Sequence, residues 1–263
     1  MGTEIHNIVA ERLYDKFKEL SFDPAKHKYT VSGVMYPSVS GLIKEFATPF
    51  NAGPISERVA EKEGVSAKVI RARWKKIADD ACDLGTRIHD FAERYTIKKY
   101  GLTTKLKFTS VTEHLKEGEE LNLQEKAAMR FWDTLPSYYV PVVMELQMFS
   151  KEFKYCGTAD IILMDTRDNS LVIGDYKTNK DLFKQFKNQK LQGIFSFLDD
   201  SPFGKYNLQL SFYQILLEQA GYKVSRRFIV WLKRDGFFNM YDTEDYTKEL
   251  LQNFKKKQLD ENW

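Results

Sequence analysis

The sequence is poor in the features that mark several classes of protein. It has two cysteines, Cys82 and Cys156, in 263 residues, so its own residues cannot supply a four-cysteine zinc or iron–sulfur site. A structural disulfide is not expected in a reducing compartment. No apolar run approaches the ~20 residues that cross a bilayer, so no membrane association is expected. The sequence also has no internal repeat and no long linker, which favours a single domain over residues 1–263.

The first fourteen residues lack the features of targeting segments. They contain Glu4 and Glu11 and no apolar signal-peptide core, so neither secretion nor organelle import is indicated. Met1-Gly2 is not followed by Ser or Thr at position 6, which argues against myristoylation. We therefore expect a soluble, cytoplasmic protein. Its hydrophobic content of 43%, with 14% aromatic residues, is ample for a large core.

The net charge of +3 is small, but the basic residues are unevenly distributed. The stretch Lys68–Lys76 holds Lys68, Arg71, Arg73, Lys75 and Lys76 and contains no acid. Further basic clusters occur at Lys98-Lys99, Lys180–Lys190 and Lys255–Lys257. Such tracts attract phosphate backbones, although a solvated helix face is the commoner explanation for any single one. Composition alone leaves both interpretations open.

Hydrophobic spacing and turn residues predict alternating helices and strands. Helices are expected over residues 4–20, from the N-cap Ser38 to Pro49, over 54–100 with an interruption near Gly64, and over 123–135, 205–220 and 247–259. Strands are expected as a pair within 22–34, over 138–154, and as two hairpins at 159–176 and 226–241. Residues 101–120 are polar and are expected to form a loop or a hairpin.

The hairpin at residues 159–176 carries charge where burial is expected. Asp160, Asp175 and Lys177 lie inside or at the end of its apolar runs, and a buried charge without a partner is costly. Side chains alternate along a strand, so Asp175 and Lys177 share a face while Tyr176 points away. Asp160 is expected opposite this segment of the second strand. Two carboxylates and one ammonium group should therefore converge.

Two explanations fit this group of charges. In the first, a divalent cation lies between the carboxylates and offsets their repulsion, and hard oxygen ligands suit Mg²⁺ or Mn²⁺. In the second, aspartate and lysine form an ordinary ion pair on an edge strand.

Further residues are candidates for the same site. His89 and Glu93 stand four residues apart, one above the other on a helix, although a lone helical histidine is more often a satisfied surface or core residue than a ligand. Gly85 in mid-helix indicates another backbone or a ligand close by. Glu145 lies in the strand expected beside Asp160, where it is either a third carboxylate of the site or an outward-facing residue of an amphipathic strand.

Five short motifs follow one another along the chain: Gly85-x-x-x-His89, Glu145, Gly157-x-x-Asp160, Asp175-Tyr176-Lys177 and Gln209-x-x-x-Tyr213. In this order, and on these types of element, the chain resembles the RecB-like branch of the PD-(D/E)XK nuclease superfamily. The segments Tyr36–Ser40 and Tyr206–Ser211 also look like those of phage-encoded exonucleases and the mitochondrial genome maintenance exonuclease within this branch. Unlike its iron–sulfur and helicase-linked relatives, the chain has neither the four cysteines nor helicase motifs.

The resemblance implies an α/β (α+β) fold of the restriction-endonuclease type, with a central mixed β-sheet flanked by helices. Its core would lie at about residues 84–241, after an N-terminal strand pair and helical region at about 1–83. The implied cofactor is Mg²⁺ or Mn²⁺, without an iron–sulfur cluster. The implied ligands are His89, Asp160, Asp175 and the main-chain carbonyl of Tyr176.

The same resemblance implies roles for the remaining motif residues. Lys177 would orient and help deprotonate the attacking water and stabilise charge in the transition state. Glu145 would support the metal ligands or bind a second ion, and Glu93 could act in the same way. Gln209 and Tyr213 would position Lys177 or the scissile strand.

The implied activity is metal-dependent hydrolysis of DNA by an exonuclease that acts on ends or single strands during replication, recombination or repair. The protein would work alone or with a separate replication or recombination protein, in the host cytoplasm if it is phage-encoded. The alternatives are a structure-dependent or sequence-selective endonuclease, against which Gln209-x-x-x-Tyr213 argues, and a non-catalytic DNA-binding protein, against which His89 and the Asp-x-Lys motif argue.

DNA contacts are expected from the basic tracts. On the predicted helix, Arg71, Arg73 and Lys76 would contact phosphates, and Trp74 is either a base-stacking platform or a core residue. After the hairpin, Lys180 and Lys184 are further candidates.

Overall fold

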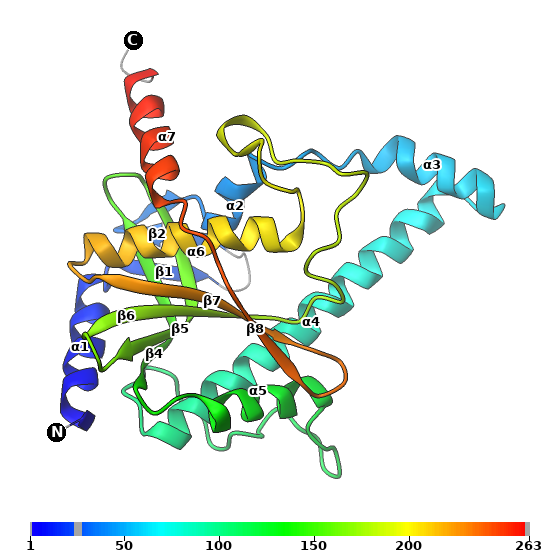
Figure 1. Cartoon of the computed structure of the whole chain (residues 1–263). Helices are drawn as coiled ribbons and strands as arrows, with labels where there is room; N and C mark the ends of the chain where they lie inside the picture. Colours follow the sequence, from blue (N-terminus) through cyan, green and yellow to red (C-terminus); the bar gives the residue numbers. More distant parts are fainter. Residues whose placement is uncertain (1, 24–27, 261–263) are drawn as a thin grey trace.

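A five-stranded mixed β-sheet forms the centre of the molecule (Figure 1). The computed structural model describes residues 2–23 and 28–260. Its strands lie side by side in chain order: β4 (Tyr139–Ser150), β5 (Tyr155–Asp165), β6 (Ser170–Lys177), β7 (Val224–Leu232) and β8 (Phe238–Asp242). Neighbouring strands are antiparallel except β6 and β7, which are parallel. The predicted mixed sheet flanked by helices is confirmed.

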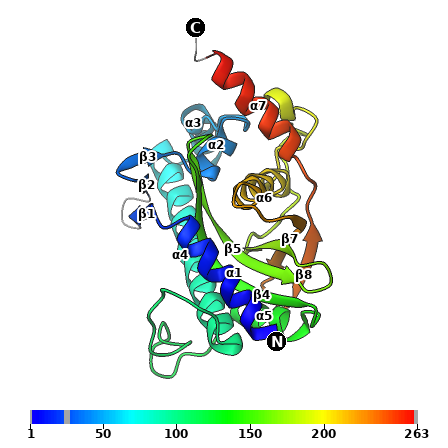
Figure 2. The same cartoon turned by 90° about the vertical axis from the view of Figure 1, so that its left-hand side faces the viewer.

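Helices cover both faces of the sheet (Figure 2): α4 (Ala67–Tyr100) and α5 (Leu123–Thr134) on one face, and α6 (Pro202–Gln219) on the other. Alternation along β5 explains why both faces are covered. Ile161 and Leu163 pack into the cluster that includes Phe131 of α5, whereas Ile162 packs into the cluster that includes Leu216 of α6. Burying each such side chain contributes roughly 1.5–3 kcal/mol, so the sheet is stable only between two helical layers.

The N-terminal part adds a small antiparallel sheet and two helices: β1 (Leu20–Asp23), β2 (Lys28–Val31) and β3 (Val34–Tyr36), with α1 (Gly2–Lys16) before them and α2 (Val39–Lys44) after them. The sequence predicts two strands in this region, whereas the structure has three. The missed strand, β3, has three residues, too few to show a period of two. The predicted break at Asp23-Pro24 falls partly outside the described residues. Helix α1 packs along β4.

Helices α3 (Ala52–Glu63) and α4 form an arm that projects from the body in Figure 1. Gly64 ends α3 in the left-handed conformation, with a φ of +65°, and the Ser66 side chain caps α4 by accepting from the Val69 N–H. Helix α4 has 34 residues and is therefore about 51 Å long. Its second half packs on the sheet, while its first half is largely exposed. The predicted interruption at Gly64 is confirmed.

Two further predictions needed correction. Helix α2 begins after Ser38, whose side chain accepts from the Gly41 N–H, but it ends at Lys44 instead of Pro49. Residues 101–122 contain no helix or strand among the described elements, so the hairpin alternative for 101–120 is wrong. Arg94 ties this segment to α4 by donating to the Val111 carbonyl at 3.2 Å and to the ring of His114 at 3.0 Å.

The last helix, α7 (Thr247–Asp260), follows β8 and packs against α6. A single-turn 3-10 helix, η1 (Gly193–Phe195), lies in the connection between β6 and α6. Among the described residues, no helix is both long and apolar enough to pass through a membrane.

Candidate active site

The register of β5 and β6 brings Asp160, Asp175 and Lys177 together. Ile161 pairs with Gly174, so Asp160 and Asp175 are the next residues along the two antiparallel strands. An oxygen of Asp160 (Oδ2) accepts from the Tyr176 N–H at 2.8 Å, and the ammonium group of Lys177 contacts Oδ2 of Asp175. Asp160 and Asp175 are both buried. The two carboxylates and one ammonium group lie at one end of the hairpin.

His89 and Glu145 join these residues from two other elements. His89, on α4, places Nδ1 3.3 Å from Oδ2 of Asp160 and 3.4 Å from Oε1 of Glu145. Glu145, on β4, therefore faces the site. The alternative interpretation, an outward-facing residue on an amphipathic strand, does not hold. Its backbone φ is +49°, a left-handed conformation that is costly for a residue with a side chain. The strand thus accommodates local strain at the position that turns this carboxylate toward His89.

Helix α6 contributes a hydrogen-bonded support for Asp175. The Gln209 amide donates to Oδ1 of Asp175 at 3.3 Å and to the Tyr213 hydroxyl at 2.9 Å. Tyr213 packs directly over Gly157 of β5, where an added Cβ would lie 2.6 Å from the Tyr213 ring. Gly157 is therefore required by this close approach.

Two residues of this site were not among the predicted site residues. The Tyr206 ring lies under the Lys177 ammonium group, 4.4 Å from ring centre to Nζ, and its hydroxyl donates to the Asn179 side chain at 2.7 Å. Tyr206 precedes Gln209 by three residues and Tyr213 by seven, so helical spacing places all three on one face of α6. That spacing was the signal that could have identified it. Asn179 has no comparable signal apart from following Lys177 by two residues.

The electrostatics of the site show a surplus of buried negative charge. Burial raises the pKa of Asp175 to about 6, and repulsion from Asp160 adds to this although Lys177 opposes it. Burial also raises the pKa of Asp160. Burial alone would lower the pKa of His89, but Asp160 and Glu145 outweigh it and raise that pKa to about 9. A positive charge beside these carboxylates would therefore be stabilised.

The residues present fit a divalent metal ion. One ligand atom each from His89, Glu145 and Asp160 lie within 4.8 Å of one another. Among the described residues, Oδ2 of Asp175 is buried and accepts no hydrogen bond, although the Lys177 ammonium group touches it. Carboxylate oxygens are ligands that suit a hard divalent cation. The structure thus groups Glu145 with His89 and Asp160, while the ligand roles predicted for His89, Asp160, Asp175 and the Tyr176 carbonyl stay predictions.

An open pocket of about 560 Å³ leads to this group of residues. Gly85, His89 and Glu93 line it from α4, and Glu145 and Thr158 line it from the sheet. Glu93 has its pKa raised to about 8, first by burial and then by the charge of Glu145. A Cβ on Gly85 would meet only the Thr178 hydroxyl at 3.8 Å, an ordinary contact. Of the two alternatives predicted for Gly85, a close backbone neighbour is therefore wrong, and a nearby ligand stays a prediction.

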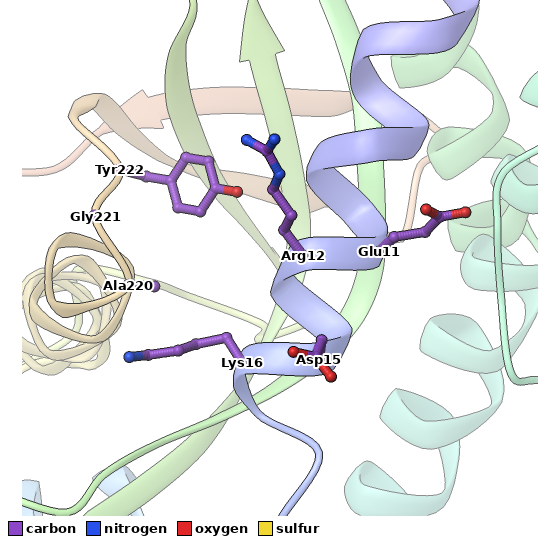
Figure 3. A pocket seen from close by; sticks show the side chains of 7 residues that line it. All are labelled: Glu11, Arg12, Asp15, Lys16, Ala220, Gly221 and Tyr222. Carbon is purple, nitrogen blue, oxygen red and sulfur yellow. The ribbon is translucent and has the colours of Figure 1, made fainter.

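A second hollow, of about 580 Å³, lies far from this chemistry between α1 and the turn after α6 (Figure 3). Arg12 points toward Tyr222, Lys16 extends toward the end of α6 near Ala220, and Glu11 and Asp15 lie on the same helix as both. None of the predicted site residues lines it.

The predicted basic tract lies on the projecting arm, away from the carboxylates. Arg71 precedes His89 by eighteen residues on one helix, about 27 Å along its axis. Arg73 pairs with Glu63 at 2.7 Å, Lys76 pairs with Asp80 at 3.0 Å, and Arg71 donates to the Ser56 hydroxyl at 2.8 Å. Trp74 packs edge-on against Phe50, with 5.7 Å between ring centres. Lys180 and Lys184 lie elsewhere, in the connection that follows Lys177.

A comparison with protein families agrees with this geometry. Residues 65–261, more than half of the chain, match the family model described as the PD-(D/E)XK nuclease superfamily. Among solved structures, a "Putative exonuclease" from Eubacterium rectale aligns with 17% identity and a TM-score of 0.39, over 68% of this chain and 64% of that chain. The chain therefore spans slightly less than two thirds of the length of that neighbour. No curated protein matches the chain.

Proposed function

The chain belongs to the PD-(D/E)XK nuclease superfamily, and from this premise we propose that it is a Mg²⁺- or Mn²⁺-dependent exonuclease that hydrolyses DNA at ends or in single strands. The observation that carries the proposal is the convergence of His89, Glu145 and Asp160 next to the ion pair of Asp175 and Lys177. A purely structural role would not require these side chains from α4, β4, β5 and β6 to meet.

His89, Glu145 and Asp160 would hold the metal ion, with Asp175 beside them. When bound, the ion lowers the pKa of an attacking water and neutralises charge that develops on the phosphate. A cation there would favour the ionised form of the buried carboxylates, against the burial and the repulsion from Asp160 that raise the pKa of Asp175.

Lys177 is held as a cation by its neighbours. Burial would lower its pKa, but Asp175, Tyr206 and Asp160 raise it above the ordinary lysine value. In this position Lys177 would orient and help deprotonate the attacking water and would stabilise the charge that builds up in the transition state. Asp175 and Tyr206 fix its position, and Gln209 fixes Asp175.

Action on DNA ends is supported by the motif order from Gly85 to Tyr213, which resembles that of RecB-like exonucleases. We propose a role in replication, recombination or repair in the cytoplasm, with phosphates also held by the basic arm around Arg71, Arg73 and Lys76.

A cleavage time course tests this proposal. Linear and circular DNA, single-stranded and double-stranded, are incubated with Mg²⁺, Mn²⁺ or EDTA. The wild-type protein is compared with Lys177→Ala and with the matched control Lys223→Ala, which removes an exposed lysine at the far end of the sheet. Metal-dependent loss of linear DNA that Lys177→Ala abolishes and Lys223→Ala retains is the expected result. Cleavage of circles would reassign the protein as an endonuclease, and DNA binding without cleavage would reject catalysis.

A further inference from the structure

The connection between β6 and α6 exposes large apolar side chains next to the candidate active site. Phe183, Phe186 and Phe197 are 47%, 58% and 55% exposed, and Ile194 is 41% exposed. Single exposed apolar residues are common, but several within fifteen residues form a patch of the kind that marks a binding surface. We call residues 180–197 the aromatic segment.

Other side chains anchor this segment firmly. Leu182, Leu191 and Phe195 are fully or almost fully buried between the exposed residues. The Leu182 carbonyl accepts from the Phe203 N–H at 2.8 Å at the start of α6. The edge of Phe183 rests on Tyr241, with 5.2 Å between ring centres. The exposed rings are therefore held on an ordered support and are not the result of a loose loop.

The segment also carries unpaired positive charge. Lys180, Lys184 and Lys187 have no ion-pair partner among residues 2–23 and 28–260, whereas Lys190 pairs with Asp199 at 2.6 Å. Asp181, the only acid between residues 180 and 190, accepts from the N–H groups that follow it in the chain. The charge of the surface therefore complements an anionic ligand.

A tight turn presents Phe186 at the tip of the segment. The Phe186 carbonyl accepts from the Gln189 N–H at 3.0 Å, and the two residues between them, Lys187 and Asn188, have φ values of +50° and +54°. Left-handed backbone is unfavourable for lysine, so the chain tolerates strain to form this turn. The Lys187 ammonium group lies 5.3 Å from the centre of the Phe186 ring. An aromatic face and a cation are thus displayed together.

The segment is tied directly to the catalytic lysine. Asn179, two residues after Lys177, accepts from the Tyr206 hydroxyl through its side chain and from the Trp231 indole N–H through its carbonyl, each at 2.7 Å. Phe186 follows Lys177 by nine residues and can lie at most about 30 Å from it. Figure 1 shows the segment running from the end of β6 to the start of α6. A strand whose phosphate lies at Lys177 would reach these rings within several nucleotides.

We propose that the aromatic segment binds single-stranded DNA, with Phe183 and Phe186 stacking on bases and Lys184 and Lys187 contacting phosphates; this rests on the proposed nuclease function. Aromatic rings interleaved with lysines are the combination that binds single strands without sequence preference. In duplex DNA the base faces are already stacked and paired, so the rings contribute only when the strand is single. The segment therefore selects the strand that reaches the metal site.

Binding is measured without cleavage, by fluorescence anisotropy of a labelled oligothymidine in EDTA, with all variants in the Lys177→Ala background. Phe183→Leu and Phe186→Leu keep apolar volume but remove the stacking ring, and Phe186→Trp keeps a ring. We expect each leucine variant to weaken single-strand binding roughly 5- to 150-fold, equivalent to about 1–3 kcal/mol, and to leave duplex binding unchanged. Phe186→Trp should bind as tightly as the parent. Lys184→Ala should lower the slope of log K against log salt by about 0.7, the value for one phosphate contact on a single strand.

Unchanged single-strand affinity in both leucine variants would overturn the proposal, and so would equal weakening on single strands and duplex. If unchanged affinity came with a shift from dimer to monomer in sedimentation, the patch would instead be a contact between copies of the chain. The assay is carried out without metal and with Lys177→Ala proteins. Its outcome would therefore stay the same if the wild-type protein failed to cleave DNA. The two proposals can therefore fail separately.

Discussion

Replacing Gly157 by alanine tests whether the support from α6 matters for activity. The added Cβ would lie 2.6 Å from the Tyr213 ring and 3.1 Å from a methyl group of Val39. Both neighbours are buried, so the ring must shift. Overpacking of this kind destabilises a protein by about 1–3 kcal/mol.

The effect on activity follows from the hydrogen bonds beyond the ring. Tyr213 accepts from Gln209, and Gln209 donates to Asp175, which contacts Lys177. A displacement of about 1 Å in a positioned group can lower the rate about 100-fold. We therefore expect Gly157→Ala to lower kcat about 100-fold with little change in KM, assayed well below its melting temperature so that the folded fraction equals that of wild type.

Tyr213→Phe is the matched control, because it keeps the ring and removes only the acceptor for Gln209. Because its ring still packs over Gly157, Tyr213→Phe should unfold with nearly the free energy of the wild-type protein. Its loss of kcat should be smaller than that of Gly157→Ala. Wild-type kcat in a Gly157→Ala protein whose melting temperature has fallen would refute the reasoning, since the ring would then have moved without disturbing Asp175.

Three other predictions concern metal, pH and thiols. Mn²⁺ at 100 times its Kd should stabilise the wild-type protein by about 2.7 kcal/mol in thermal unfolding, and His89→Ala should lose this effect; an equal shift in both would contradict the ligand assignment. Burial would raise the pKa of Glu125, but hydrogen bonds from Arg87, the Asn122 N–H and His114 hold it below its ordinary value of 4.5. This lowered pKa contributes stability above pH 4.5, and that stability is lost as the pH falls through the folded-state pKa. Glu125→Gln should therefore destabilise the protein by about 2 kcal/mol at pH 7 and by progressively less in acid. A difference in the free energy of urea unfolding that stays the same at every pH would contradict this. Cys156 is buried and burial raises the pKa of its thiol to about 12, so a maleimide at pH 7.5 should label exposed Cys82 alone, and a labelled Cys82→Ser protein would contradict this.

The part of the site that sequence predicted best is local in the chain. Asp160, Asp175 and Lys177 lie on one hairpin, where the turn residues set the register and strand alternation sets the face. The structure places these three charges together at the end of the paired strands. Short-range rules suffice there because every partner lies within eighteen residues.

Contacts between distant elements could not be derived in the same way. Whether His89 meets Glu145 depends on how α4 packs across β4, and the left-handed φ of Glu145 has no local signature such as glycine. The two ion pairs of the basic tract differ in whether the sequence could predict them. Its ion pair between Lys76 and Asp80 has the spacing of adjacent helical turns, but the pairing of Arg73 with Glu63 requires α3 to fold back on α4.

The most direct test of the central claim is the release of nucleotides from end-labelled linear DNA by wild-type protein and by Asp175→Asn, each with Mn²⁺ and with EDTA. The substitution preserves the shape of the buried side chain and removes its charge beside Lys177 and the candidate metal ligands. The account predicts release only by the wild-type protein and only with Mn²⁺. Release by Asp175→Asn at the wild-type rate, or release in EDTA, would contradict it.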